Sequence, residues 1–176
     1  MDMNTEACKT KYMRAAIKQG QLAAKKGEVP VGAVIVKDGT VIAKAHNLRE
    51  SRKQPTAHAE LLAIEKAAKK LGGWRLSGCT LYVTLEPCPM CAGAIINARL
   101  DQVVYGAVDS KAGYTGTLHD TLGDKRLNHQ CRVESGVLAE ECAQLLKVFF
   151  AGRRAEQKAK TDGVYALSGE KKGESL

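Results

Sequence analysis

Two periodicities of apolar residues alternate along this chain, and one of them is helical. Apolar residues spaced for one helix face recur in four segments, which predicts four helices. These segments cover residues 11–26, 57–70, 88–98 and 138–158. Residues 161–176 carry little to bury, which predicts a mobile polar tail.

The second periodicity consists of short β-branched runs, which predict strands. The runs are residues 31–36, 40–45, 80–84 and 102–106, with a weaker one near Val133. Asp38 and Gly39 separate the first two runs, and an Asp-Gly pair in this position is a strong hairpin signal. The first two strands are therefore expected to be antiparallel. Polar loops are expected at residues 47–55 and 109–123.

Because strands alternate with helices, the pattern predicts an α/β fold of three layers, α-β-α. The predicted sheet has five strands, is mixed because it begins with a hairpin, and is flanked by helices on both faces. At 176 residues the chain is long enough for one ordinary domain, expected at residues 8–160.

Composition narrows the class of protein without deciding its function. The chain is 44% hydrophobic and 26% charged, which is typical of a soluble protein. No run approaches the roughly 20 apolar residues of a membrane span, and no apolar leader is visible, so a cytoplasmic protein is expected. The net charge of +8 is compatible with a polyanionic partner such as nucleic acid, and equally with a solvated basic surface.

The chain has six cysteines, and their interpretation depends on the expected compartment. In a reducing compartment, clustered cysteines more often bind metal or react than form disulfides. Only Cys88 and Cys91 have ligand spacing. The others are expected to be small core or surface residues; they are Cys8, Cys79, Cys131 and Cys142.

A third candidate ligand, His58, stands 30 positions before Cys88, and each residue opens a predicted helix. Cys88 and Cys91 share a helix face at i, i+3, so both sulfurs can reach one ion. Thiolates with imidazole select zinc. Three ligands leave a fourth position for water, as in a catalytic zinc site. Four further residues could close the site, although none is in a ligand-spaced motif: His46, Cys79, His119 and His129.

Glu60 lies two residues after His58, and residues at i and i+2 of a helix point to different sides. Its carboxylate is therefore expected beside the metal, where a general acid or base belongs, and not on it. Two alternatives stay open on the residues alone. The cysteine pair could be a redox dithiol, or the zinc site could be structural.

His58-Ala59-Glu60 followed by Pro87-Cys88-Pro89-Met90-Cys91 is the zinc deaminase signature. The surrounding segments EVPVGAV, PTAHAELLAI, TLYVTLEPCPMCAGA and VVYGAVDSKAG extend the likeness. Over residues 12–158 the chain resembles the bacterial tRNA-specific adenosine deaminase family, whose members make inosine at the anticodon wobble position. Guanine and cytosine deaminases share several of these segments.

The resemblance implies a cytidine deaminase-like fold, one Zn²⁺ per subunit, and a homodimer that binds the tRNA anticodon stem-loop. By the same resemblance Glu60 is the catalytic acid/base. The implied substrate-binding residues are Asn47, Asp109, Lys111, Phe150 and Arg153. Two rival functions remain: a deaminase of a free nucleobase or nucleotide, and a non-catalytic, zinc-stabilised RNA-binding module.

Overall fold

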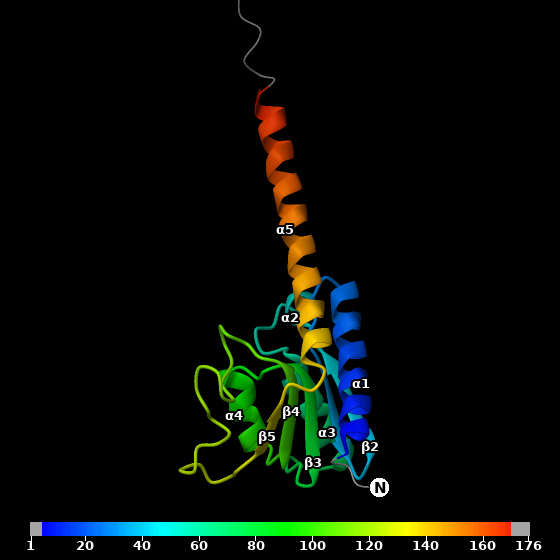
Figure 1. Ribbon diagram of the computed structural model, residues 1–176, viewed down its shortest axis with the longest axis vertical. Helices are drawn as coiled ribbons and strands as arrows, with labels where there is room; N and C mark the ends of the chain where they lie inside the picture. The colour runs from blue at the N-terminus through cyan, green and yellow to red at the C-terminus, as the bar shows by residue number, and fades with distance from the viewer. Residues whose placement is uncertain (1–4, 170–176) are drawn as a thin grey trace, which may run out of the picture.

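A five-stranded sheet organises the computed structural model, which describes the backbone of residues 5–169 and the side chains of residues 5–161. Figure 1 shows the sheet below a long C-terminal helix. The helices are α1 (Glu6–Lys25), α2 (Arg49–Arg52), α3 (Ala59–Leu71), α4 (Pro89–Asn97) and α5 (Ala139–Gly169). The strands are β1 (Gly32–Lys37), β2 (Thr40–His46), β3 (Cys79–Leu85), β4 (Gln102–Ala107) and β5 (Arg132–Ser135).

The strand order is β2-β1-β3-β4-β5. β1 pairs antiparallel with β2 and β3, whereas β3–β4 and β4–β5 pair parallel, so the predicted mixed sheet is confirmed. The three inner strands are almost wholly buried, in keeping with their continuous apolar sequences. The outer strands β2 and β5 carry more exposed residues.

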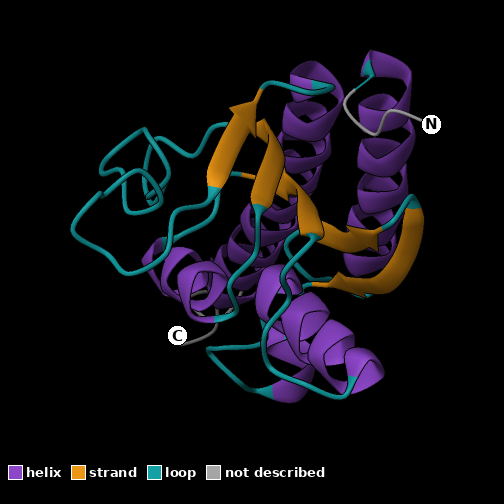
Figure 2. Cartoon of the chain, turned by 90° about the horizontal axis from the view of Figure 1, so that it is seen from below, coloured by secondary structure: helices purple, strands orange, loops and turns teal. Residues whose placement is uncertain are grey.

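Helices cover both faces of the sheet, as Figure 2 shows. α3 and α4 pack on one face around a core that includes Leu62, Leu81 and Ile95. α1 and the beginning of α5 pack on the other face with a core that includes Met13 and Val104. The predicted three-layer α-β-α architecture is therefore confirmed.

Two predicted chain reversals have the backbone conformations that their sequences favour. Asp38 and Gly39 adopt φ values of 46° and 74°, and positive φ at both central residues matches the type I′ turn that suits a two-residue hairpin. Gly72 ends α3 in the left-handed conformation at φ 71°, where glycine has no Cβ penalty.

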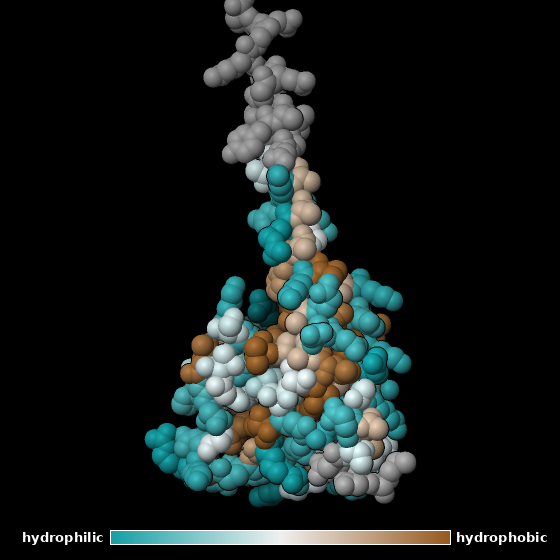
Figure 3. Space-filling view, viewed as in Figure 1, coloured by the Kyte–Doolittle hydropathy of each residue, from teal (hydrophilic) through white to brown (hydrophobic). Residues whose placement is uncertain are grey.

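The C-terminal helix is longer than predicted. The pattern ends it at residue 158, but α5 continues to Gly169, so residues 161–169 of the predicted tail are helical and residues 170–176 lie outside the described residues. Every side chain from 151 to 161 is exposed. Figure 1 shows this part of α5 projecting from the body, and Figure 3 shows hydrophilic side chains beside mildly hydrophobic ones along it.

The loop prediction for residues 47–55 was incomplete, because the single turn of α2 lies within it. No helix among residues 5–169 combines the length and apolar character needed to cross a bilayer.

Candidate metal centre and active site

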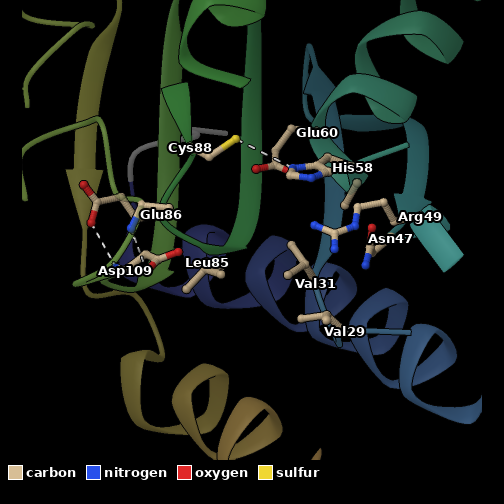
Figure 4. A pocket seen from close by; sticks show the side chains of 12 residues that line it. Val29, Val31, Asn47, Arg49, His58, Glu60, Leu85, Glu86, Cys88 and Asp109 are labelled. Carbon is tan, nitrogen blue, oxygen red and sulfur yellow. Dashed lines mark hydrogen bonds between the residues drawn. The ribbon is translucent and has the colours of Figure 1, made fainter. Parts of the chain in front are cut away.

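A pocket of about 230 Å³ opens beside the carboxyl end of β3, where α3 and α4 begin. In open α/β sheets, ligands bind outside the carboxyl ends of the strands. Its volume is below the roughly 300–1,000 Å³ of sites for drug-sized ligands, so it suits one small group. The lining residues, drawn in Figure 4, are Val29, Val31, Asn47, Arg49, His58, Ala59, Glu60, Leu85, Glu86, Cys88, Asp109 and Ala112.

His58 and Cys88 each occupy the N-cap position of a helix, α3 and α4 respectively. Neither side chain makes the capping hydrogen bond usual at this position, so both remain available for another partner. Pro89 follows Cys88 in the first turn of α4, where a missing backbone N–H costs nothing. Cys91 lies one turn further along α4 and is fully buried.

These three residues converge on one point in space. The Nδ1 atom of His58 lies 3.7 Å from Sγ of Cys88 and 3.6 Å from Sγ of Cys91. A Zn–N bond of about 2.05 Å and a Zn–S bond of about 2.3 Å at the tetrahedral angle separate nitrogen from sulfur by about 3.6 Å. The donor set and its spacing therefore fit a tetrahedral zinc ion.

Among the side chains that the structure describes, no fourth histidine, cysteine or carboxylate joins this cluster. The four residues considered as further ligands have other surroundings. His46 contacts Gln19 and Lys26, and His129 contacts the Leu100 carbonyl. The His119 ring packs against Tyr114, and Cys79 is part of the core. The described side chains therefore supply three ligands for an ion, and two of these, His58 and Cys88, also line the pocket.

The pKa of Cys88 is lowered, whereas the pKa values of Cys91, Cys131 and Cys142 are raised. Hydrogen bonds from Cys91 and from His58 lower the pKa of Cys88 to about 4. The same hydrogen bond and burial raise the pKa of Cys91. Burial raises the pKa of both Cys131 and Cys142 to about 12, which keeps those two thiols protonated. A thiolate, the form that binds zinc, is therefore favoured at the cluster.

Glu60 lines the same pocket but is not among the clustered ligand atoms. It is 4% exposed, and burial raises the pKa of its carboxyl group. Figure 4 shows Glu60 near His58 and Cys88. A carboxyl group with a raised pKa next to a metal position is suited to accepting and returning a proton.

Three comparisons with known proteins agree with this geometry. Residues 7–154 match the model of the family described as MafB19-like deaminase. The chain is 56% identical over 148 residues to the tRNA-specific adenosine deaminase of Bacillus subtilis, covering 84% of this chain and 92% of the relative. The chain belongs to the family of tRNA-specific adenosine deaminases.

Solved structures of similar proteins support the fold of this deaminase family. A structure from a study of A-to-I editing by tRNA:A34 deaminases has a TM-score of 0.75 and 42% identity, covering 78% of this chain and 99% of that chain. A guanine deaminase from Bacillus subtilis has a TM-score of 0.56 and 42% identity, covering 64% of this chain and 71% of that chain.

The substrate-binding residues implied by resemblance to the deaminases fall into two groups. Asn47 and Asp109 line the pocket, and Lys111 is exposed on the loop that Asp109 begins. The Asp109 carboxylate accepts hydrogen bonds from the backbone N–H groups of Lys111 and Ala112, which fixes that turn. Phe150 and Arg153 lie on α5 and do not line the pocket.

Three charged residues in or beside the pocket of this deaminase were not anticipated from the sequence: Arg49 and Glu86 line it, and Glu28 lies next to its Asn47. Arg49 lines the pocket at the start of α2 and brings positive charge to it. Two buried carboxylates, Glu28 and Glu86, hold the loops on either side of the pocket. The sequence does offer one signal for Glu28 and Glu86, because each is a glutamate next to an apolar strand. Such a residue is either solvated or strongly hydrogen-bonded.

Proposed function

We propose that this chain converts adenosine to inosine at the wobble position of a tRNA anticodon loop by zinc-dependent hydrolytic deamination. The observation that carries the proposal is a three-ligand zinc geometry with a buried carboxylate beside it in a small pocket. Relatives named for this activity share up to 56% of aligned residues with the chain.

His58, Cys88 and Cys91 would hold the ion, which when bound supplies an activated water at its open position. Glu60 then has three proton-handling roles. It takes a proton from the attacking water, delivers it to N1 of the adenine ring, and assists departure of the amino group from C6. Water and adenosine thus become inosine and ammonia.

The small pocket also determines how the target base must be presented to the active site. A base stacked in a helix cannot expose C6, so the target nucleotide must leave the stack and enter the pocket. Anticodon loops present unstacked bases readily. Val29, Val31 and Leu85 give the pocket apolar walls, which suit the faces of a purine ring.

RNA contacts outside the pocket are proposed at the residues that the family resemblance implies. Asn47 would hydrogen-bond the target nucleoside, while Asp109 and Lys111 would line the path of the anticodon loop. Phe150 and Arg153 would contact RNA from α5. Charge supports the last proposal, because residues 147–161 carry five lysine or arginine side chains and a single glutamate.

Replacing Arg153 by alanine is expected to weaken tRNA binding and to reduce the slope of log K against log salt by about 1, because one phosphate contact is lost. Fluorescence anisotropy with tRNA at several salt concentrations would measure both effects. The control is Lys37→Ala, at the end of β1 opposite the pocket. An equal change in slope for both variants would assign the effect to net charge and not to α5.

We also propose that the protein acts as a homodimer in the cytoplasm. The resemblance to the tRNA-specific deaminase family supports the dimer, and a tRNA substrate supports the compartment. Sedimentation velocity of the purified chain would measure the oligomeric state, and a single monomeric species at micromolar concentration would contradict the dimer.

A second candidate function is deamination of a free base, which the likeness to a guanine deaminase favours. Incubation with purified tRNA, and separately with free adenine, guanine and cytosine, followed by an ammonia assay, discriminates the two. Nucleoside mass spectrometry of the treated tRNA should then detect inosine at the wobble base. Ammonia released only from free bases would replace the proposed substrate, and tRNA binding without any ammonia would identify a non-catalytic module.

A further inference from the structure

Two glutamates beside the pocket are more deeply buried than their charge would normally allow. Glu28 is 0% exposed and Glu86 is 2% exposed, although neither belongs to the metal cluster. A buried carboxylate is tolerated when hydrogen bonds satisfy it. Each of the two meets that condition by binding one of the loops that flank the pocket.

Glu28 binds the segment that follows β2. Its Oε1 accepts hydrogen bonds from the backbone N–H and the hydroxyl of Ser51, both at 2.6 Å. Its Oε2 accepts from the backbone N–H of Glu50 at 3.1 Å and from Nδ2 of Asn47 at 3.5 Å. Burial alone would raise the pKa of Glu28, but the hydrogen bonds from Ser51 and Glu50 hold it below its usual range. The carboxylate is therefore charged and can only accept hydrogen bonds.

The charged carboxylate of Glu28 determines the orientation of the Asn47 side-chain amide. Because Glu28 offers no donor, Asn47 must direct its NH₂ group toward Glu28 and its Oδ1 atom away from it. Asn47 lines the pocket and is only 7% exposed, yet Oδ1 has no hydrogen-bond partner. In Figure 4 this oxygen lies on the side of Arg49. A buried acceptor without a partner is costly unless a ligand supplies the donor.

We infer that Glu28 is a positioning residue for deamination: it holds the Asn47 amide so that a carbonyl acceptor, and not an N–H donor, faces the bound nucleoside. The ligand group is accordingly a hydrogen-bond donor of that nucleoside. This inference rests on the proposed function, since it assigns Glu28 a role that acts through Asn47 in the same pocket.

A double-mutant cycle tests whether Glu28 acts through Asn47. Glu28→Gln keeps the shape of the side chain but replaces one acceptor by a donor, which misdirects the Asn47 amide. In the wild-type background, kcat/KM for tRNA is expected to fall about tenfold, the effect of one misplaced hydrogen bond. In the Asn47→Ala background, the same substitution is expected to change kcat/KM by less than about twofold, because the residue it positions is already absent.

Glu86→Gln is the matched control. Glu86 is equally buried and accepts hydrogen bonds from the opposite loop, including those from Asp109, Thr115 and Thr117. It makes no hydrogen bond to Asn47, so its effect should multiply with that of Asn47→Ala. Zinc content and the thermal unfolding midpoint are measured for each variant. If Glu28→Gln costs the same factor in both backgrounds, as Glu86→Gln should, Glu28 is a structural residue and the inference fails.

A second pair of variants covers the case in which Glu28→Gln alone does not fold. Asn47→Asp places a second carboxylate against that of Glu28, and the two repel each other. Adding Glu28→Gln replaces one of these carboxylates by an amide, whose NH₂ group can donate a hydrogen bond to the other. The double variant is expected to be several-fold more active than Asn47→Asp alone, whereas lower activity would overturn the inference. Wild-type protein that releases no ammonia from tRNA would instead refute the proposed function. An active wild type without coupling would refute only the role of Glu28.

Discussion

Replacing Glu60 by alanine is expected to leave one zinc ion per chain in place while kcat for tRNA deamination falls about 10²–10⁴-fold, the usual contribution of a general acid/base. The reason is geometric: Glu60 lines the pocket but is not among the three clustered ligand atoms. Metal analysis by inductively coupled plasma mass spectrometry gives the zinc content, and inosine formation gives the rate.

The control for this variant is Glu65→Ala on the same helix, because Glu65 is exposed and neither lines the pocket nor belongs to the metal cluster. It should retain both zinc and activity. If Glu60→Ala loses its zinc and unfolds, then Glu60 is a fourth ligand, the site is structural, and the deaminase mechanism is refuted.

Replacing Cys91 by alanine is expected to abolish both zinc binding and deamination. Only two of the three ligands would remain. Even the loss of a residue that merely hydrogen-bonds a metal ligand weakens metal binding about 10–100-fold. Zinc affinity should therefore fall by more than about 100-fold. Competition with a chromogenic chelator measures this affinity directly.

Cys131→Ala is the matched control, since Cys131 is also a buried cysteine but belongs to the hydrophobic core. It is expected to keep one zinc ion per chain and full activity. Zinc retained by Cys91→Ala at wild-type affinity would mean that Cys91 is not a ligand.

The sheet was largely predictable from the sequence because its strands obey simple patterns. β1, β3 and β4 are continuous apolar runs and became the buried centre, while Asp38 and Gly39 specified the hairpin. The helical turn of α2 was not predictable, since it depends on Glu28 accepting hydrogen bonds from Glu50 and Ser51 across more than 20 residues. The C-terminal end of α5 was predicted too early in the sequence, because the exposed residues there lack the apolar periodicity on which the prediction relied.

The chemistry of the site was predictable to the extent that it is local. His58 with Glu60, and Cys88 with Cys91, form two short motifs whose spacing already indicates one metal, and the structure brings them together. Glu28 and Glu86 form no motif, and their role exists only because folding buries them against loops 22 to 31 residues away. The assignments of Asn47, Asp109, Lys111, Phe150 and Arg153 to RNA remain predictions.

The solvated stretch of α5 from 151 to 161 has a consequence for how the molecule responds to heat. A helix without tertiary packing has roughly the stability of an isolated peptide helix, which is marginal below about 12–15 residues. On warming, this stretch should therefore lose its helical hydrogen bonds at temperatures that leave the sheet and the metal ligands intact. The catalytic body and the projecting arm would then respond to temperature as two separate cooperative units.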